Sequence, residues 1–203
     1  MRRWLDRDVV EAEKERPIFP STYKAVQVAY MMEAAPPSPK SVLHVLQEMV
    51  PDDYPEDKVN TSGIDFGGMS TEDQRAECAI IRLIVERTLD GVELDVIHAK
   101  FGRNGFFANT QSEAVKKMIN HVRPTYTGLA KVAGEDITKR VFCRWEHKQG
   151  ILSCESIAEK HGKCGYKTIS NAFNDAKKVC FSWERDAFRK LSPIFIARGL
   201  SFY

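Results

Sequence analysis

The sequence lacks the features of a membrane protein and of a disulfide-bonded one. No apolar run approaches the roughly 18 residues that a bilayer-spanning helix needs, so we expect no membrane segment. The start of the chain, Met1–Asp8, is rich in charge and lacks the apolar core of a secretory signal. The five cysteines are irregularly spaced and form no CxxC pair, which argues against a disulfide framework. These absences predict a cytoplasmic protein.

Motifs of catalysis and of cofactor binding are missing as well. The sequence contains no GxxxxGK[ST], HExxH or GxSxG motif, and no GxGxxG motif in a βαβ setting. Cys154, His161 and Cys164 are close in sequence, but their spacing fits no familiar zinc module, and Cys is a common small core residue. An acidic cluster at residues 52–57 lies in a proline-rich loop without a rigid scaffold. We therefore expect no enzyme, no metal site and no cofactor.

Apolar residues recur at helical spacing along most of the chain, which predicts an all-α, mainly helical fold. Before residue 70, prolines separate two short helices, Thr22–Ala34 and Pro39–Val50, and a linker follows at Pro51–Met69. A longer helix, Thr71–Leu89, is expected after a capping box at Ser70. The residues that we expect this helix to bury are Ala76, Ala79, Ile80, Leu83 and Ile84.

The order of helices and turns then repeats, which indicates an internal duplication. Val96–Gly102 aligns with Ser156–Gly162 at an offset of 60 residues. After each aligned segment a further helix is expected, Gln111–Val122 in the first copy and Tyr166–Val179 in the second. The predicted domains are an N-terminal extension and linker (1–69), tandem three-helix helix-turn-helix units (70–125 and 126–182), and a C-terminal helix with an apolar tail (183–203).

The second unit has the pattern of a DNA-binding helix-turn-helix. Ala158 is a small residue in the first helix, and Gly162, four residues later, can adopt the positive φ of a tight turn. On the next helix, Ile169 and Ala176 mark the inward side, so polar side chains point outward, where they can bond base edges and phosphates. The predicted DNA-binding residues here are Lys163, Tyr166, Lys167, Thr168, Ser170, Asn171, Asn174, Lys177 and Lys178.

The first unit departs from this pattern. His98 stands where the second unit has Ala158, and the loop Arg103–Thr110 is longer than a tight turn. The unit is either a second DNA reader or a packing and dimerisation unit. Its predicted DNA-binding residues are Arg103, Gln111, Ser112, Lys116 and Lys117.

The distribution of charge supports a polyanion-binding end. The net charge is only +2, but from Ile137 onward the chain has 13 Lys and Arg against 6 Asp and Glu. The remaining residues carry 17 basic and 22 acidic side chains, so the C-terminal third is basic on an acidic body. A solvated basic face is the alternative interpretation of the charge alone.

The run Ser156–Gly162, followed by Gly165, Tyr166 and the helix to Lys178, resembles the helix-turn-helix of sigma-factor-type DNA-binding proteins. It is also similar to that of the phage Q antitermination proteins, particularly the shorter zinc-free kind. The resemblance covers roughly residues 70–180 and implies a small phage or prophage transcription factor that binds double-stranded DNA and engages RNA polymerase. The extra Lys163-Cys164 in the turn departs from the pattern, so the recognition register can shift by one or two residues.

Two other functions stay open at the level of sequence. A small terminase-type subunit would also recognise DNA, whereas a helical adaptor would bind another protein and no DNA. The apolar tail, Ile194–Tyr203, needs cover from its own core or from a partner chain, which leaves a homodimer open.

Overall fold

The structure, a computed structural model, is all-α in the part of the chain that it describes, which confirms the predicted fold class. It describes residues 17–35, 39–48, 61–102, 110–142, 152–162 and 164–202. Within these ranges no strand forms, and one isolated bridge pairs Phe19 with Ser201. No helix there combines the length and the apolar character that crossing a bilayer would require.

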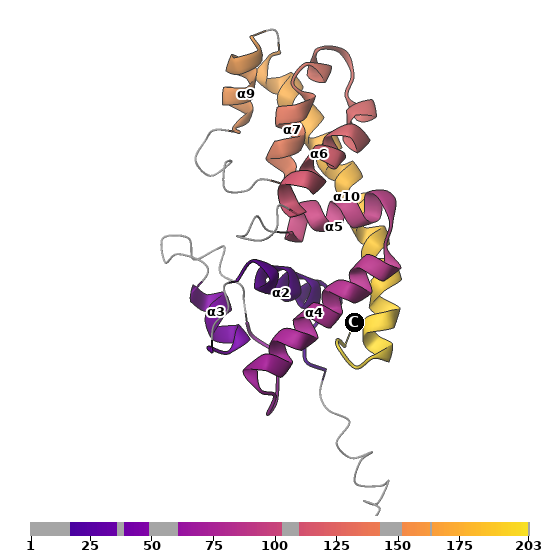
Figure 1. Ribbon diagram of the computed structural model, residues 1–203. Helices are drawn as coiled ribbons and strands as arrows, with labels where there is room; N and C mark the ends of the chain where they lie inside the picture. The colour runs from indigo at the N-terminus through magenta and orange to yellow at the C-terminus, as the bar shows by residue number, and fades with distance from the viewer. Residues whose placement is uncertain are drawn as a thin grey trace, which may run out of the picture.

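Eight α-helices and two short 3-10 helices make up the described chain (Figure 1). The α-helices are α2 (Thr22–Ala34), α3 (Val42–Glu48), α4 (Thr71–Thr88), α5 (Gly91–Phe101), α6 (Thr110–Val122), α7 (Gly134–Phe142), α9 (Cys154–His161) and α10 (Tyr166–Ala197). The 3-10 helices are η2 (Arg123–Thr125) and η3 (Gly128–Lys131). The observed bounds of α2 are those expected from the sequence.

Helix α10 is a single helix of 32 residues that runs along the length of the molecule (Figure 1). Its N-terminal part lies beside α7 and α9, and its C-terminal part lies beside α2 and α4. The helix expected to end at Val179 continues to Ala197, so that expectation is wrong, and Pro193 lies inside the helix. Buried residues continue past both points at spacings of three, four or seven, so packing against the other helices holds α10 together: they are Ile169, Ala176, Cys180, Glu184, Ala187, Leu191 and Phe195.

Helix α2 forms the centre of the lower half in Figure 1. Val26, Val28 and Tyr30 are fully buried, although they point in different directions around the helix, because α3, α4, α5 and α10 all pack against it. The predicted division of the chain into domains, in which α2 belongs to an extension, stays a prediction.

The C-terminal tail docks on the N-terminal part of the same chain. The Phe19 N–H donates to the Leu200 carbonyl at 3.0 Å, and the hydroxyls of Thr22 and Ser201 lie 3.0 Å apart. Leu200 is buried as a result. The chain therefore covers Phe195 and Leu200 of its apolar tail, whereas Ile196 and Phe202 stay exposed.

Helix α4 turns a different side to the core from the one expected. Of the five residues predicted to be buried, only Ile84 is buried, and Ala76, Ala79, Ile80 and Leu83 are exposed. The buried stripe is Gln74, Cys78, Ile81, Ile84 and Val85. Gln74 is anchored inside because its Nε2 donates to the Met69 carbonyl and its Oε1 accepts from the Val42 N–H, each at 3.1 Å. An apolar stripe is thus left on the outer side of α4.

Candidate nucleic-acid interface

Helices α9 and α10 are joined by a tight turn of the kind expected. The Ser153 hydroxyl accepts the Ser156 N–H at 3.0 Å and caps the start of α9. Gly162 ends α9 with φ of +52°, and its N–H donates to the Ala158 carbonyl at 2.9 Å. Gly165 then begins α10. The predicted left-handed glycine at position 162 is confirmed.

The turn and both helices are fixed from the inside. Ile157 and Ile169 are buried between the helices, and the Cys164 thiol donates to the Leu129 carbonyl at 3.0 Å, which ties the turn to η3. The Arg140 guanidinium of α7 lies 4.8 Å from the centre of the Phe173 ring on α10. These contacts set the direction in which α10 leaves the turn.

Asp136 ties α7 to α9. It lies inside α7, where its Oδ2 is 2.8 Å from both Lys160 Nζ and His161 Nε2. Burial alone would raise the pKa of Asp136, but the hydrogen bonds from Lys160 and His161 outweigh burial and hold this pKa below its ordinary value. Asp136 is therefore charged at neutral pH and neutralises positive charge at the end of α9.

The outer side of α10 carries a polar stripe, which we call the α10 stripe: Lys167, Asn171, Asn174 and Lys178. Its members follow one another at intervals of four, three and four residues, so they share one face of the helix. All four are exposed, and the buried Ile169, Ala176 and Cys180 lie on the opposite side. Lys167 has no ion-pair partner among the described residues, whereas Lys178 lies 3.5 Å from Asp175.

The other predicted residues of this unit flank the α10 stripe. Tyr166, Thr168 and Lys177 are exposed, with 53% of Tyr166 accessible, and Ser170 is half-buried. Lys163 lies outside the described residues.

Sequence reasoning missed two basic residues on the same face. Arg185 and Arg189 follow Lys178 after seven and eleven residues, which continues the helical repeat of the stripe. Arg185 is exposed, and Arg189 is exposed with Asp186 at 3.4 Å. The signal was present in the spacing, but the expected helix end at Val179 concealed it. From Lys167 to Arg189 the face extends over about 33 Å.

The first unit is arranged differently. Gly102 has φ of −54°, so it does not adopt the left-handed conformation of Gly162. The Gln111 amide donates to the Ala99 carbonyl at 3.2 Å and holds α6 against α5. Lys117 Nζ lies 3.3 Å from Asp95, and Lys116 is exposed. Ser112 is half-buried, and Arg103 lies outside the described residues.

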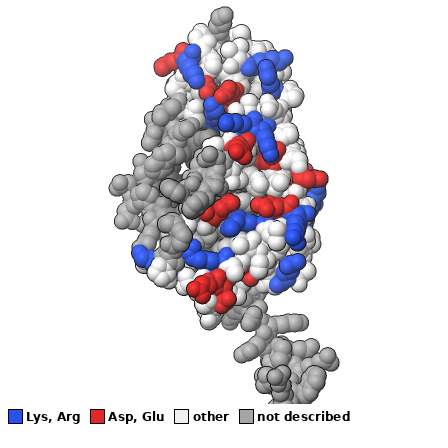
Figure 2. Space-filling view, in the orientation of Figure 1, with Lys and Arg blue, Asp and Glu red and all other residues white. Residues whose placement is uncertain are grey.

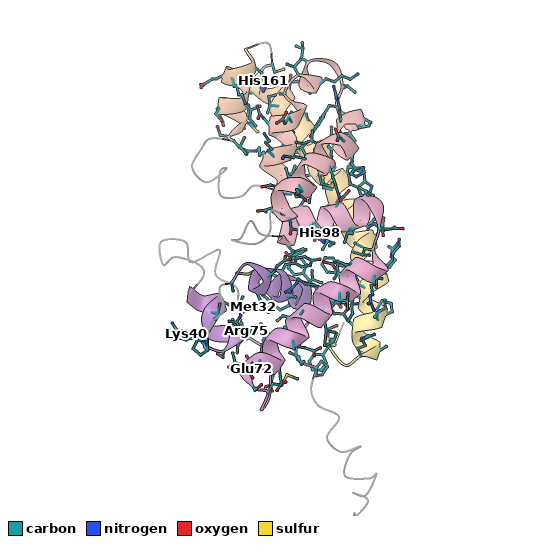
Figure 3. The ribbon with its side chains drawn as sticks, in the orientation of Figure 1. Met32, Lys40, Glu72, Arg75, His98 and His161 are labelled. Atoms are coloured by element: carbon teal, nitrogen blue, oxygen red, sulfur yellow. The ribbon has the colours of Figure 1, made fainter. Side chains whose placement is uncertain are left out.

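His98 marks a further difference between the two units. In Figure 3, His98 lies midway along the molecule, facing α2, whereas His161 lies near the upper end. The Nε2 of His98 is 3.0 Å from the Tyr30 hydroxyl, so the residue that replaces Ala158 joins α5 to α2. Burial lowers the pKa of His98, and the nearby carboxylates of Glu86 and Asp95 offset this only in part.

Charge on the face shown in Figure 2 is mixed, with acidic and basic side chains interspersed. No group of three or more His, Cys, Asp or Glu suited to a metal ion occurs among the described residues. Cys154 and Cys164, the cysteines considered for such a site, are buried thiols. The chain matches no family model and no curated protein.

Proposed function

We propose that this protein binds double-stranded DNA, with the N-terminal part of α10 in the major groove. The observation that carries the proposal is the α10 stripe, which is exposed directly after a rigid glycine turn. Helix-turn-helix proteins read bases with the first turns of the second helix, and Asn171 offers an amide that can bond adenine through two hydrogen bonds. The first turn of α10 is the positive end of the helix dipole, which suits a phosphate.

The roles of the basic residues follow from their position along α10. Lys167 is in the first turn, within reach of base edges, whereas Lys177 and Lys178 are farther along and suit phosphates. Asp136 already neutralises Lys160, so Lys160 offers little charge to DNA. Lys167 and Lys177 have no such partner among the described residues, which leaves their charge for the nucleic acid.

The finer proposal is a sequence-specific transcription regulator of phage or prophage type, antiterminator-like, that engages RNA polymerase. It rests on the resemblance of Ser156–Lys178 to that class of helix-turn-helix. The connection of α9 to α10 through Gly162 is compatible with it, and the different turn at Gly102 favours a single reading unit in each chain.

A mobility-shift titration at several salt concentrations tests the proposal. We expect wild-type protein to bind random duplex at about 50 mM salt and to lose affinity as salt rises, because bound counterions are released from DNA. Duplexes selected from a random pool should bind at least about a thousandfold more tightly than random duplex. Equal binding of selected and random duplex would exclude a specific reader.

The alternative is a helical adaptor that binds a protein partner, and the exposed apolar stripe of α4 favours it. Absence of any duplex binding at about 50 mM salt, where non-specific contacts are strong, would support the adaptor and contradict DNA binding.

A further inference from the structure

The outer side of α4 carries an apolar stripe with a charge of opposite sign at each end. Ala76, Ala79, Ile80 and Leu83 are exposed on this side, with 41% of Ile80 and 43% of Leu83 accessible. Glu72 and Arg87 lie on the same face, seven or eight residues from its centre. We call these six residues the α4 face. The helix crosses the front of the lower half of the molecule, with Glu72 at its lower end (Figures 1 and 3).

The α4 face is complementary to itself when the second copy is antiparallel. In the register that sets Ala79 opposite Ile80 of the other copy, Ala76 comes opposite Leu83, so each large side chain meets a small one. The same register sets Glu72 opposite Arg87. Each pairing occurs twice in a two-fold dimer, because a residue contacts its counterpart in both directions. A parallel arrangement would instead bring Glu72 toward Glu72 and Arg87 toward Arg87.

We propose that the α4 face is a homodimer contact in which the two α4 helices pack antiparallel, Glu72 of one copy facing Arg87 of the other. Helices that cross at about 20° stay close enough to pair along the roughly 22 Å of this face. Glu72 and Arg87 have no ion-pair partner among the described residues, so both are available for a second copy. Uncharged surface lies between the charged side chains over α4 in Figure 2.

The contact buries a small area, so we expect a weak dimer. One helix pair of this length covers less than the roughly 1,200 Å² of the smallest stable specific interfaces, so we expect a dissociation constant between about 10 μM and 1 mM. The proposal does not depend on DNA binding, and its test contains no nucleic acid.

Charge reversal of the end residues tests the antiparallel register. We expect Glu72→Arg alone and Arg87→Glu alone each to weaken the dimer about tenfold, because both ion pairs of the dimer become like-charge pairs. An equimolar mixture of the two variants should restore association to about the wild-type level. In the mixed dimer the arginine introduced by Glu72→Arg faces the glutamate introduced by Arg87→Glu, and the unchanged Glu72 faces the unchanged Arg87. Sedimentation velocity from about 1 μM to 1 mM protein measures all three samples.

Matched variants separate this effect from a change in folding. Glu113→Arg reverses an equally placed acidic residue in the first turn of α6 and should leave the dimer unchanged. Leu83→Asp should weaken the dimer by about 30-fold or more, because it removes two apolar side chains from the contact, while circular dichroism stays that of wild type. Wild-type protein that stays monomeric at every concentration would overturn the proposal. So would a mixture of the two reversals that associates no better than either alone.

Discussion

Gly162 is the residue on which the turn before α10 depends. Its φ of +52° lies in the left-handed region, and apart from the adjoining backbone and neighbouring residues no atom lies within 4 Å of the place where a Cβ would be. The cost of a side chain at Gly162 is therefore conformational and not steric. Gly165 has the same open surroundings, but its φ is −70°, which any residue can adopt.

We expect Gly162→Ala to lower the free energy of unfolding by about 1–2 kcal/mol, the cost of left-handed backbone for a residue with a Cβ. Gly165→Ala is the control and should change it by less than about 0.5 kcal/mol. Urea unfolding followed by circular dichroism measures both. Equal losses in the two variants would contradict a special role for the positive φ.

His98 makes the free energy of unfolding depend on pH. Its pKa is lowered from the ordinary 6.5 because it is buried against Tyr30, so the unfolded chain takes up a proton at higher pH than the folded chain does. Stability due to His98 is therefore complete above pH 6.5 and is lost as pH falls from there through the lowered pKa. His98→Gln keeps a hydrogen-bonding group and should flatten the stability curve between about pH 7 and 5. Urea titrations across that range test this, and an unchanged slope would contradict it.

At the scale of elements, the ends of helices were more predictable than their buried sides. Ser70 and Gly162 act where expected, because a cap or a left-handed turn depends on one residue and its immediate neighbours. The side that α4 buries depends on what packs against it. Ile80 and Leu83 are as apolar as Ile81 and Val85, so the sequence of α4 permits either side to be buried. On the side that is buried, Gln74 forms hydrogen bonds to Val42 and Met69, which precede the helix.

The course of α10 has a similar explanation. Pro193 lacks the N–H that would bond to the Arg189 carbonyl, which normally ends or kinks a helix. Here Leu191 and Phe195, on either side of Pro193, are fully buried and keep the helix continuous. This tertiary packing is absent from the local pattern, and for that reason the basic face beyond Lys178 was also missed.

The proposed DNA contacts of α10 are of two kinds, base contacts near the start of the helix and phosphate contacts farther along. We expect Lys167→Ala or Asn171→Ala to lower the discrimination between the preferred base pair and the others, at one position of the DNA, by about 1–3 kcal/mol of binding free energy. Lys177→Ala should weaken binding to all duplexes alike and lower the salt slope by about one. Binding of a panel of single-base variants, measured at two salt concentrations, separates the two effects. The same sequence profile for all three variants would argue against base reading by the first turns.

At the scale of the whole molecule, α10 links the two ends of the protein. Its N-terminal part holds the proposed interface, and its C-terminal part packs in the lower half beside α2 and α4 (Figure 1). Because one continuous helix belongs to both halves, loosening one half removes support from the other.

Phe195→Ala tests this link at a place far along α10 from the proposed interface. Phe195 is fully buried, so the variant should lose about 3–5 kcal/mol of unfolding free energy. We expect one unfolding transition, with faster amide hydrogen exchange in α9 as well as in α2. Ile196→Ala, at a neighbouring exposed position, is the control and should stay within about 0.5 kcal/mol of wild type. Exchange that changes in the lower half alone would mean that the halves unfold independently.

The buried cysteines can report where and in which order the folded protein opens. Cys78 lies in α4, Cys154 in α9, Cys164 in the turn before α10 and Cys180 in the middle of α10, and none of these four forms a disulfide. Burial raises the pKa of Cys78 and Cys180 to about 12, so few thiolates are present in the closed state. A thiol reagent can therefore label these residues only when their surroundings open. The order in which the four are labelled would report which end of the protein opens first.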